Sequence, residues 1–134
     1  MVSGVLKLDF DNKYKSKRMD ESRIGWVCRF IRLDVRDVKA WKTKHGTHVK
    51  IWTGRRLSPL MAVMVQALCN SDYARECYNL VRAINLLDKE KKYSKAVSES
   101  FNVLFYKKMA GGKVVGMEKF DPVATKRLRK CLGL

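Results

Sequence analysis

The chain has 134 residues, and its 29 Lys and Arg outnumber its 13 Asp and Glu, which gives a formal net charge of +16. This length suits one domain with its own core, and a hydrophobic content of 46% excludes compositional disorder. No apolar run is long enough to span a bilayer, and the N-terminus has neither signal-peptide nor transit-peptide character. We therefore expect a single basic domain over residues 1–134, located in the cytoplasm, with no membrane partner.

The positive charge predicts a polyanionic partner. Such an imbalance attracts polyanions over long distances, and nucleic acid is the commonest polyanion in a cell. An anionic membrane surface fits less well, because neither terminus combines a basic helix with a broad apolar face. The composition does not distinguish DNA from RNA, and it leaves sequence specificity and oligomeric state open.

The first third of the chain has the patterns of strands. Residues 5–11 alternate between apolar and polar side chains, which predicts a half-buried strand. The polar residues 12–23 predict an exposed loop. Residues 26–35 are rich in Val, Phe, Ile and Leu and predict a second strand, which resumes through Trp41. The apolar residues change from odd-numbered to even-numbered positions at Asp37–Val38, which indicates a bulge or a break there.

A hairpin is predicted around a turn at Lys44–Gly46, where glycine can adopt the positive φ of a tight turn. The strand that follows, residues 47–53, has two distinct faces. One face is partly apolar and carries Thr47, Val49, Ile51 and Thr53. The other face carries His48, Lys50 and Trp52.

Two helices are predicted next. Ser58 and Pro59 serve as the cap and first-turn proline of a helix that runs to Cys69 and is apolar nearly all round. A second helix runs from Tyr73 to about Leu87. On this second helix we expect a buried stripe made of Tyr73, Cys77, Leu80 and Ile84.

The last third of the chain has the patterns of a loop, two strands and a final helix. Residues 88–100 predict a charged loop, and residues 101–106 predict a strand. A glycine pair after Ala110 turns the chain into another strand over 113–116. Asp121 and Pro122 cap a helix over 123–131, which exposes Lys126, Arg127, Arg129 and Lys130.

This order of elements predicts an α+β domain, with a mostly antiparallel curved sheet and helices packed on one face. The expected shared core consists of Leu33, Val49, Ile51, Val63, Leu68, Leu80 and Leu104. Four cysteines, Cys28, Cys69, Cys77 and Cys131, have no Cys-x-x-Cys spacing. We expect buried thiols, although one disulfide remains open.

Two groups of residues are candidates for nucleic-acid contact. The first places an imidazole, an ammonium and an indole on one strand face, followed by two arginines that close the strand. The second is a helix stripe of planar donors that suits phosphates or base edges. The alternative for both is an ordinary solvated surface. The candidate nucleic-acid-binding residues are His48, Lys50, Trp52, Arg55, Arg56, Arg75 and Arg82.

A metal site is an alternative at the first strand. Asp9 and Asp11 share one strand face, where they could bind a divalent cation such as Mg²⁺ or Mn²⁺. The simpler interpretation, which the residues alone favour, is that they mark the solvent side of the strand end. The sequence offers no confident third acid for a two-metal site, so we expect no cofactor and assign no catalytic residue.

The motifs together resemble a reduced archaeo-eukaryotic primase-type palm. They are hydrophobic-Asp-hydrophobic-Asp on the first strand, Thr-Lys-His-Gly-Thr-His around the hairpin and Ser-Asp-Tyr-x-Arg before a helix. The resemblance implies a ferredoxin-like or RNA-recognition-motif-like fold, with metal at Asp9 and Asp11 and nucleotide phosphates at His48. Gly-Thr-His replaces the family's Ser-x-His, and the chain is far shorter than a complete primase.

The chain also resembles small uncharacterised proteins of archaea and archaeal viruses. Thr-x-His-Gly-x-His, Ser-Asp-x-x-Arg-Glu-Cys and an Asn-Val-Leu-Phe-like segment carry this second resemblance, over most of residues 26–131. If the chain is viral, its location is the interior of the host cell.

Three functions are therefore open. The first is nucleic-acid binding in replication or genome handling of an archaeal virus or plasmid. The second is a metal-dependent nucleotidyl-transfer (primase-like) or nuclease enzyme, and the third is a viral structural or interaction protein.

Overall fold

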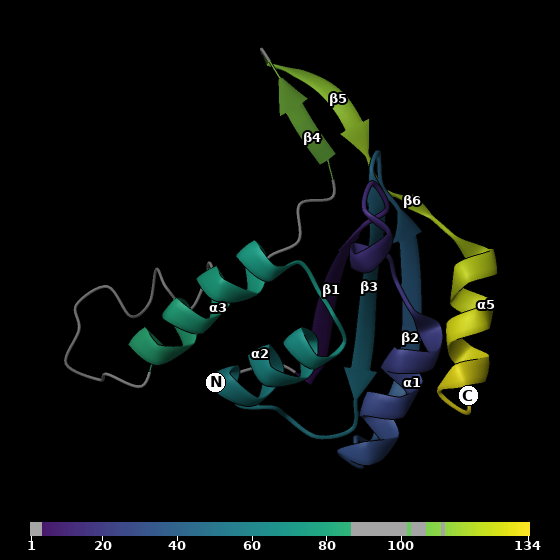
Figure 1. The fold of residues 1–134 in the computed structure, drawn as a ribbon, viewed down its shortest axis with the longest axis vertical. Helices are drawn as coiled ribbons and strands as arrows, with labels where there is room; N and C mark the ends of the chain where they lie inside the picture. The colour runs from purple at the N-terminus through teal and green to yellow at the C-terminus, as the bar shows by residue number, and fades with distance from the viewer. Residues whose placement is uncertain (1–3, 87–101, 103–106, 111) are drawn as a thin grey trace.

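The computed structural model describes residues 4–86, 102, 107–110 and 112–134. They form one α+β arrangement with a central sheet (Figure 1). In chain order the elements are β1 (Val5–Asp11), the short 3-10 helix η1 (Lys15–Lys17), α1 (Glu21–Phe30), β2 (Val35–Lys42), β3 (Gly46–Thr53), α2 (Pro59–Leu68), α3 (Tyr73–Leu86), β4 (Lys107–Ala110), β5 (Lys113–Met117), β6 (Lys119–Phe120) and α5 (Pro122–Cys131).

The central sheet has four strands in the spatial order β1-β3-β2-β6, and each neighbouring pair is antiparallel. Because β1 and β2 both run antiparallel to β3, they run parallel to each other, and α1 is the crossover between them. The predicted α+β class and antiparallel pairing are confirmed. The ferredoxin-like topology stays a prediction, because the fourth described strand lies beside β2.

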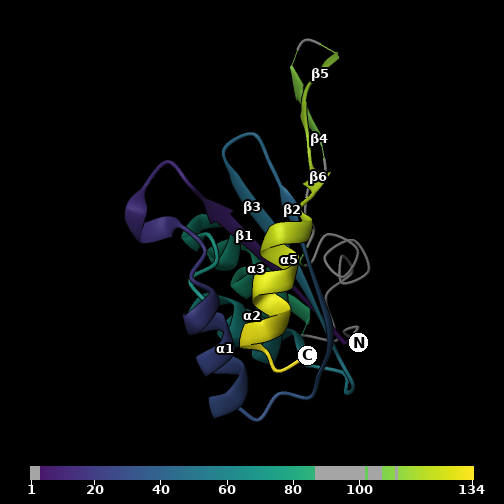
Figure 2. The same ribbon diagram turned by 90° about the vertical axis from the view of Figure 1, so that its right-hand side faces the viewer.

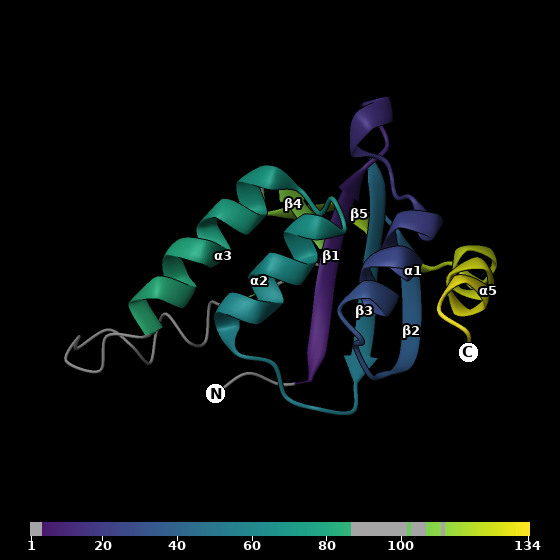
Figure 3. The ribbon, with the colours of Figure 1, turned by 60° about the horizontal axis from the view of Figure 1, so that its bottom comes forward.

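The core lies between one face of this sheet and the helices. Side chains at alternate positions of β1, β2 and β3 meet apolar residues of α1, α2 and α5 in one cluster. Figures 1 and 3 show α1 and α2 over the same face, with α3 beside α2 on the side of β1. The fully buried strand residues of the cluster are Leu6, Leu8, Phe10, Val38, Ala40, Val49 and Ile51.

The strand predicted over residues 26–35 is wrong, because Glu21–Phe30 forms helix α1. Asp20 caps the start of the helix, and its side chain accepts a hydrogen bond from the Arg23 amide. Its buried residues include Ile24, Val27 and Cys28, which recur at the spacing of three and four that a helix buries on one face. β-Branched and aromatic residues favour a strand, but burial of this helical face against the sheet selects the helix.

The hairpin and its bulge are confirmed, with one correction. The β2–β3 register shifts between Val35 and Asp37, where the apolar parity changes. Gly46 is not among the residues with positive φ, so the turn does not need glycine for that reason. A Cβ atom at Gly46 would collide with the Phe10 carbonyl oxygen, so glycine is needed because β1 approaches closely.

The buried stripe predicted for the second helix is wrong. The helix exists as α3, but Tyr73 is 78% exposed and Ile84 is 53% exposed. The residues that α3 buries are Glu76, Asn79 and Ala83. Of the expected core, Leu33, Val49, Ile51 and Val63 are buried, Leu68 and Leu80 are exposed, and Leu104 lies outside the described residues.

In the C-terminal third, the strand predicted over 113–116 and the helix predicted over 123–131 are present as β5 and α5, whereas β4 and β6 were not predicted. β4 and β5 form a two-stranded hairpin around Gly112, whose φ of 75° is the left-handed value that glycine permits. Figures 1 and 2 show this hairpin projecting away from the central sheet. Asp121 caps α5 by accepting from the Ala124 amide. The predicted loop 88–100 and strand 101–106 lie outside the described residues, apart from Asn102.

The four cysteines are all free thiols, and Cys28 and Cys69 are buried. Burial raises the pKa of Cys28 to about 11 and that of Cys69 to about 12, so both stay protonated near neutral pH. None of the helices in the described ranges is both long and apolar enough to cross a bilayer.

Candidate nucleic-acid interface

The sheet face opposite the core carries a row of three lysines. In the strand register Lys7 of β1 lies opposite Lys50 of β3, which lies opposite Lys39 of β2. Directly opposed residues point to the same face, with Cβ atoms about 5 Å apart. Within the described ranges no helix lies over this face (Figures 1 and 3). We call it the open face.

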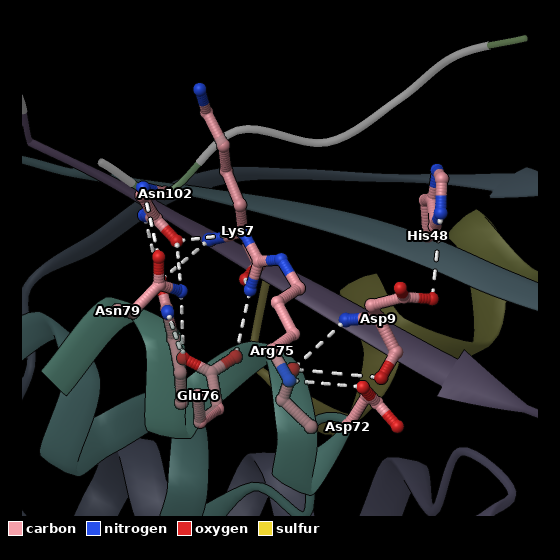
Figure 4. A network of polar contacts seen from close by, with 10 residues as sticks. Lys7, Asp9, His48, Asp72, Arg75, Glu76, Asn79 and Asn102 are labelled. Carbon is pink, nitrogen blue, oxygen red and sulfur yellow. Dashed lines mark hydrogen bonds and ion pairs between the residues drawn. The ribbon is translucent and has the colours of Figure 1, made fainter. Parts of the chain in front are cut away.

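Opposed like charges destabilise a sheet, so this row costs stability. Burial lowers the pKa of the Lys7 ammonium, and the neighbouring cations Lys50 and Arg75 lower it further. The side chain of Lys7 points away from α3 toward the open face (Figure 4). An anion placed over the row would relieve this repulsion.

Two tryptophans flank the lysine row on the open face. Trp41 lies opposite His48 and Trp52 lies opposite Asp37, one row to either side of the lysines. The Lys50 ammonium lies 5.3 Å from the centre of the Trp41 ring, and the Lys39 ammonium lies 5.9 Å from the Trp52 ring. Lys39 and Lys50 therefore each cover the indole on the neighbouring strand, and both indoles stay partly exposed.

His48 points to the predicted face but is only 7% exposed. Its Nδ1 lies 2.9 Å from Oε2 of Glu118, and its Nε2 lies 3.4 Å from Oδ1 of Asp9. Glu118 stands between β5 and β6, so the ring joins the C-terminal part of the chain to the sheet. Both ring nitrogens are thus directed at carboxylates of the protein itself.

The pKa of His48 is raised above its ordinary value. Burial opposes the charged form, but hydrogen bonds and the negative charges of Asp9 and Glu118 outweigh it. Two acceptors can be satisfied together only when both nitrogens carry a proton, which is the imidazolium form. The raised pKa favours this form, in which His48 links two carboxylates inside the protein.

The side chain of Arg75 contacts the edge of β1 (Figure 4). Its Nη1 donates to the Lys7 carbonyl oxygen at 2.8 Å and to Glu76 at 2.7 Å, and its Nη2 donates to Asn102 at 2.8 Å. Its side chain is 12% exposed. The guanidinium therefore holds α3 and Asn102 against the strand, which leaves it poorly placed to meet an external phosphate.

A buried polar network continues from this arginine. Gln66 of α2 accepts from the Lys7 amide and from Asn102, and it donates to Glu76. Asn79 donates to Glu76 and accepts from the Asn102 amide. No buried polar side-chain atom in the described part of the chain lacks a hydrogen bond. The network therefore covers the outer edge of β1 with buried side chains whose polar atoms are hydrogen-bonded.

The remaining predicted residues lie apart from the lysine row. Arg55 and Arg56 are exposed in the loop between β3 and α2. Arg82 is half-buried on α3, 5.9 Å from the Tyr78 ring. The open face therefore brings Lys50 and Trp52 together, but the lysine row does not include these arginines.

The two aspartates of the metal alternative share the strand face as predicted. Asp9 contacts His48, and Asp11 Oδ1 accepts from the Lys13 amide at 2.8 Å. Over the ranges that the structure describes, no group of three or more His, Cys, Asp and Glu residues could hold a metal ion.

The sequence reasoning missed Lys7, Lys39 and Trp41 as members of the open face. The alternation of each strand could have indicated this face, because each of the three residues lies next to a buried apolar residue of its own strand. Neighbouring residues of a strand point to opposite faces of the sheet. Trp41 and Lys39 could be placed only with β2 paired to β3, and Lys7 only with β1 on the other side of β3. Comparison with protein-family models, with curated proteins and with solved structures found no match to this chain.

Proposed function

We propose that this protein binds nucleic acid through the open face of its sheet. The observation that carries the proposal is the in-register row of Lys7, Lys50 and Lys39. Three ammonium groups on one face repel one another, and a polyphosphate backbone laid across them replaces that repulsion with attraction. The net charge of +16 adds a long-range attraction for the same ligand.

The proposal includes a fold assignment. The order β1-α1-β2-β3-α2 and the spatial order β1-β3-β2 match the first five elements of the ferredoxin-like βαββαβ pattern. We propose that the chain is a variant of this pattern, as in RNA-recognition-motif-like palms, in which polar side chains close the β1 edge. A role in replication or genome handling belongs to the same proposal.

The test is a fluorescence-anisotropy titration with labelled DNA and RNA at low salt. We expect binding at micromolar protein, weakening as salt rises. Three phosphate contacts predict a slope of about −2 in a plot of log affinity against log salt for a single strand. Replacing Lys7, Lys39 and Lys50 together by Gln should remove most of that slope.

The matched control carries the same loss of charge elsewhere. Lys44 lies in the β2–β3 turn, and Lys126 and Lys130 lie exposed on α5. Replacing these three by Gln should leave most of the affinity and most of the slope. Equal losses in the two triple variants would show that the charge acts without a defined site, and absence of binding by the unchanged protein would refute the proposal outright.

A further inference from the structure

We propose that Trp41 and Trp52 are stacking platforms for unpaired bases, so that the ligand of the open face is a single-stranded nucleic acid. This inference rests on the proposed function and adds the class of strand that the site accepts. The observation that carries it is the placement of both indoles on the open face, one on each side of the lysine row.

The register sets the spacing of the two platforms. Trp41 is opposite His48, which precedes Trp52 by four residues on β3. Four residues of strand span about 13 Å, with neighbouring strands about 5 Å apart. The indoles would accordingly accept two bases that are not adjacent, while the phosphates between them lie over the lysines.

A duplex would not use these platforms. Its bases are already paired and stacked, so only its backbone can lie on a sheet face. A single strand can turn its bases outward onto aromatic rings while its phosphates meet lysines, and such stacking tolerates any base. The combination of basic and aromatic side chains therefore favours single strands over duplexes.

The lysines and the indoles are coupled in the free protein. The Lys50 ammonium covers the Trp41 ring, and the Lys39 ammonium covers the Trp52 ring. A cation–π contact at an exposed site is weaker than stacking of a base on an indole. When a phosphate takes the ammonium, the ring it covered becomes free for a base, so the two kinds of contact should form together.

The third tryptophan provides an internal control. Trp26 lies on α1, is 55% exposed and stacks on Phe30 at 5.0 Å between ring centres. Because α1 covers the opposite face of the sheet, Trp26 should not contact the ligand. The chain thus carries two tryptophans at the proposed site and one away from it.

The first experiment compares one labelled DNA oligonucleotide as a single strand and as a duplex, at equal salt. We expect tighter binding to the single strand. Trp41→Leu and Trp52→Leu should each weaken single-strand binding about five- to a hundredfold, the range of one lost base stack, and should leave duplex binding nearly unchanged. Trp26→Leu should change neither. Circular dichroism and thermal unfolding establish that each variant is folded.

The second experiment uses milder substitutions and reads the indoles directly. Trp26→Phe keeps only the two open-face indoles, and the single strand should quench and shift their fluorescence. The double variant Trp41→Phe and Trp52→Phe keeps only Trp26, whose emission should not respond.

The outcomes separate this inference from the proposed function. Equal binding of both strand forms, with no effect of Trp41 and Trp52, would overturn the inference while the lysine test still stands. A response of Trp26 as large as that of the open-face indoles would also overturn it. If the unchanged protein binds neither form, the proposed function itself fails.

Discussion

His48 shows how one side chain can serve the fold at a position where the sequence suggested ligand contact. It lies on the predicted face, but Asp9 and Glu118 occupy both of its nitrogens. Glu118 is 70 residues away in the chain, so no local pattern could pair the two. The imidazole ring links β3 to the segment between β5 and β6. The proposed ligand contacts are made by the neighbouring residues Lys50 and Trp52.

The raised pKa of His48 makes stability depend on pH. A group whose folded pKa is above its unfolded value of about 6.5 stabilises the fold fully below that value. This contribution is lost as the pH rises through the folded pKa. The free energy of unfolding should therefore fall as the pH is raised from about 6 to above the folded pKa of His48.

Urea unfolding over a series of pH values checks this expectation. His48→Gln should flatten the dependence, since glutamine keeps polar contacts but does not titrate. His45→Gln is the control, because His45 is the other histidine of the chain and lies exposed in the hairpin turn. An unchanged slope in His48→Gln would show that the link to Asp9 and Glu118 is not the source.

At the scale of elements, the outer edge of β1 explains why α3 turns a polar face inward. An unpaired strand edge exposes amide and carbonyl groups that must find partners. Gln66 and Ser71 accept from the amides of Lys7 and Asp9, and Arg75 donates to the Lys7 carbonyl. These partners come from α2, α3 and the turn between them, so an apolar face of α3 could not have closed this edge.

Removing the arginine of this network should be costly. Arg75→Ala leaves the buried carboxylate of Glu76 without its cation and the Lys7 carbonyl without its donor. Breaking a buried ion pair from one side destabilises a protein by about 3–5 kcal/mol. Urea unfolding should show this loss as a lower midpoint.

Arg82 is the matched control for that substitution. It lies on the same helix, and its guanidinium makes a cation–π contact with Tyr78 at 5.9 Å from the ring centre. Arg82→Ala should cost about 1 kcal/mol or less. Similar losses in the two variants would mean that the guanidinium of Arg75 does not hold the strand edge.

At the scale of the whole molecule, the net charge of +16 opposes compaction. Exposed ion pairs such as Arg36–Asp34 and Arg127–Glu21 offset little of it, since surface pairs contribute about 0–1 kcal/mol each. The excess cations therefore leave a net self-repulsion that a polyanion or added salt can screen.

The unfolding temperature should accordingly rise with ionic strength. Raising salt from about 0.01 M to about 0.1 M shortens the screening length from about 30 Å to about 10 Å. Thermal unfolding followed by circular dichroism measures the shift. The Lys44, Lys126 and Lys130 triple Gln variant should start higher at low salt and respond less. A fall in unfolding temperature on adding salt would mean that attractive pairs outweigh the repulsion.

Features that depend on neighbouring residues could be predicted from the sequence alone. The alternation of β1, the hairpin between β2 and β3, and the caps Ser58 and Asp121 were all predicted correctly. Each is fixed by side-chain spacing or by a hydrogen bond within a few residues, so local sequence suffices. From the local sequence, only His48, Lys50 and Trp52 were assigned to the face that the structure shows as the open face.

Only the tertiary structure decided which apolar run became α1 and which face of α3 turned inward. Apolar residues at 24, 27 and 28 satisfy a helix, yet the same segment has the composition of a strand, and burial against the sheet selects the helix. The lysine row joins residues 7, 39 and 50 through strand pairing, and Arg75 reaches Lys7 across 68 positions. Contacts between such distant residues depend on the register of the paired strands. That register is fixed because one face of the sheet is buried in the core.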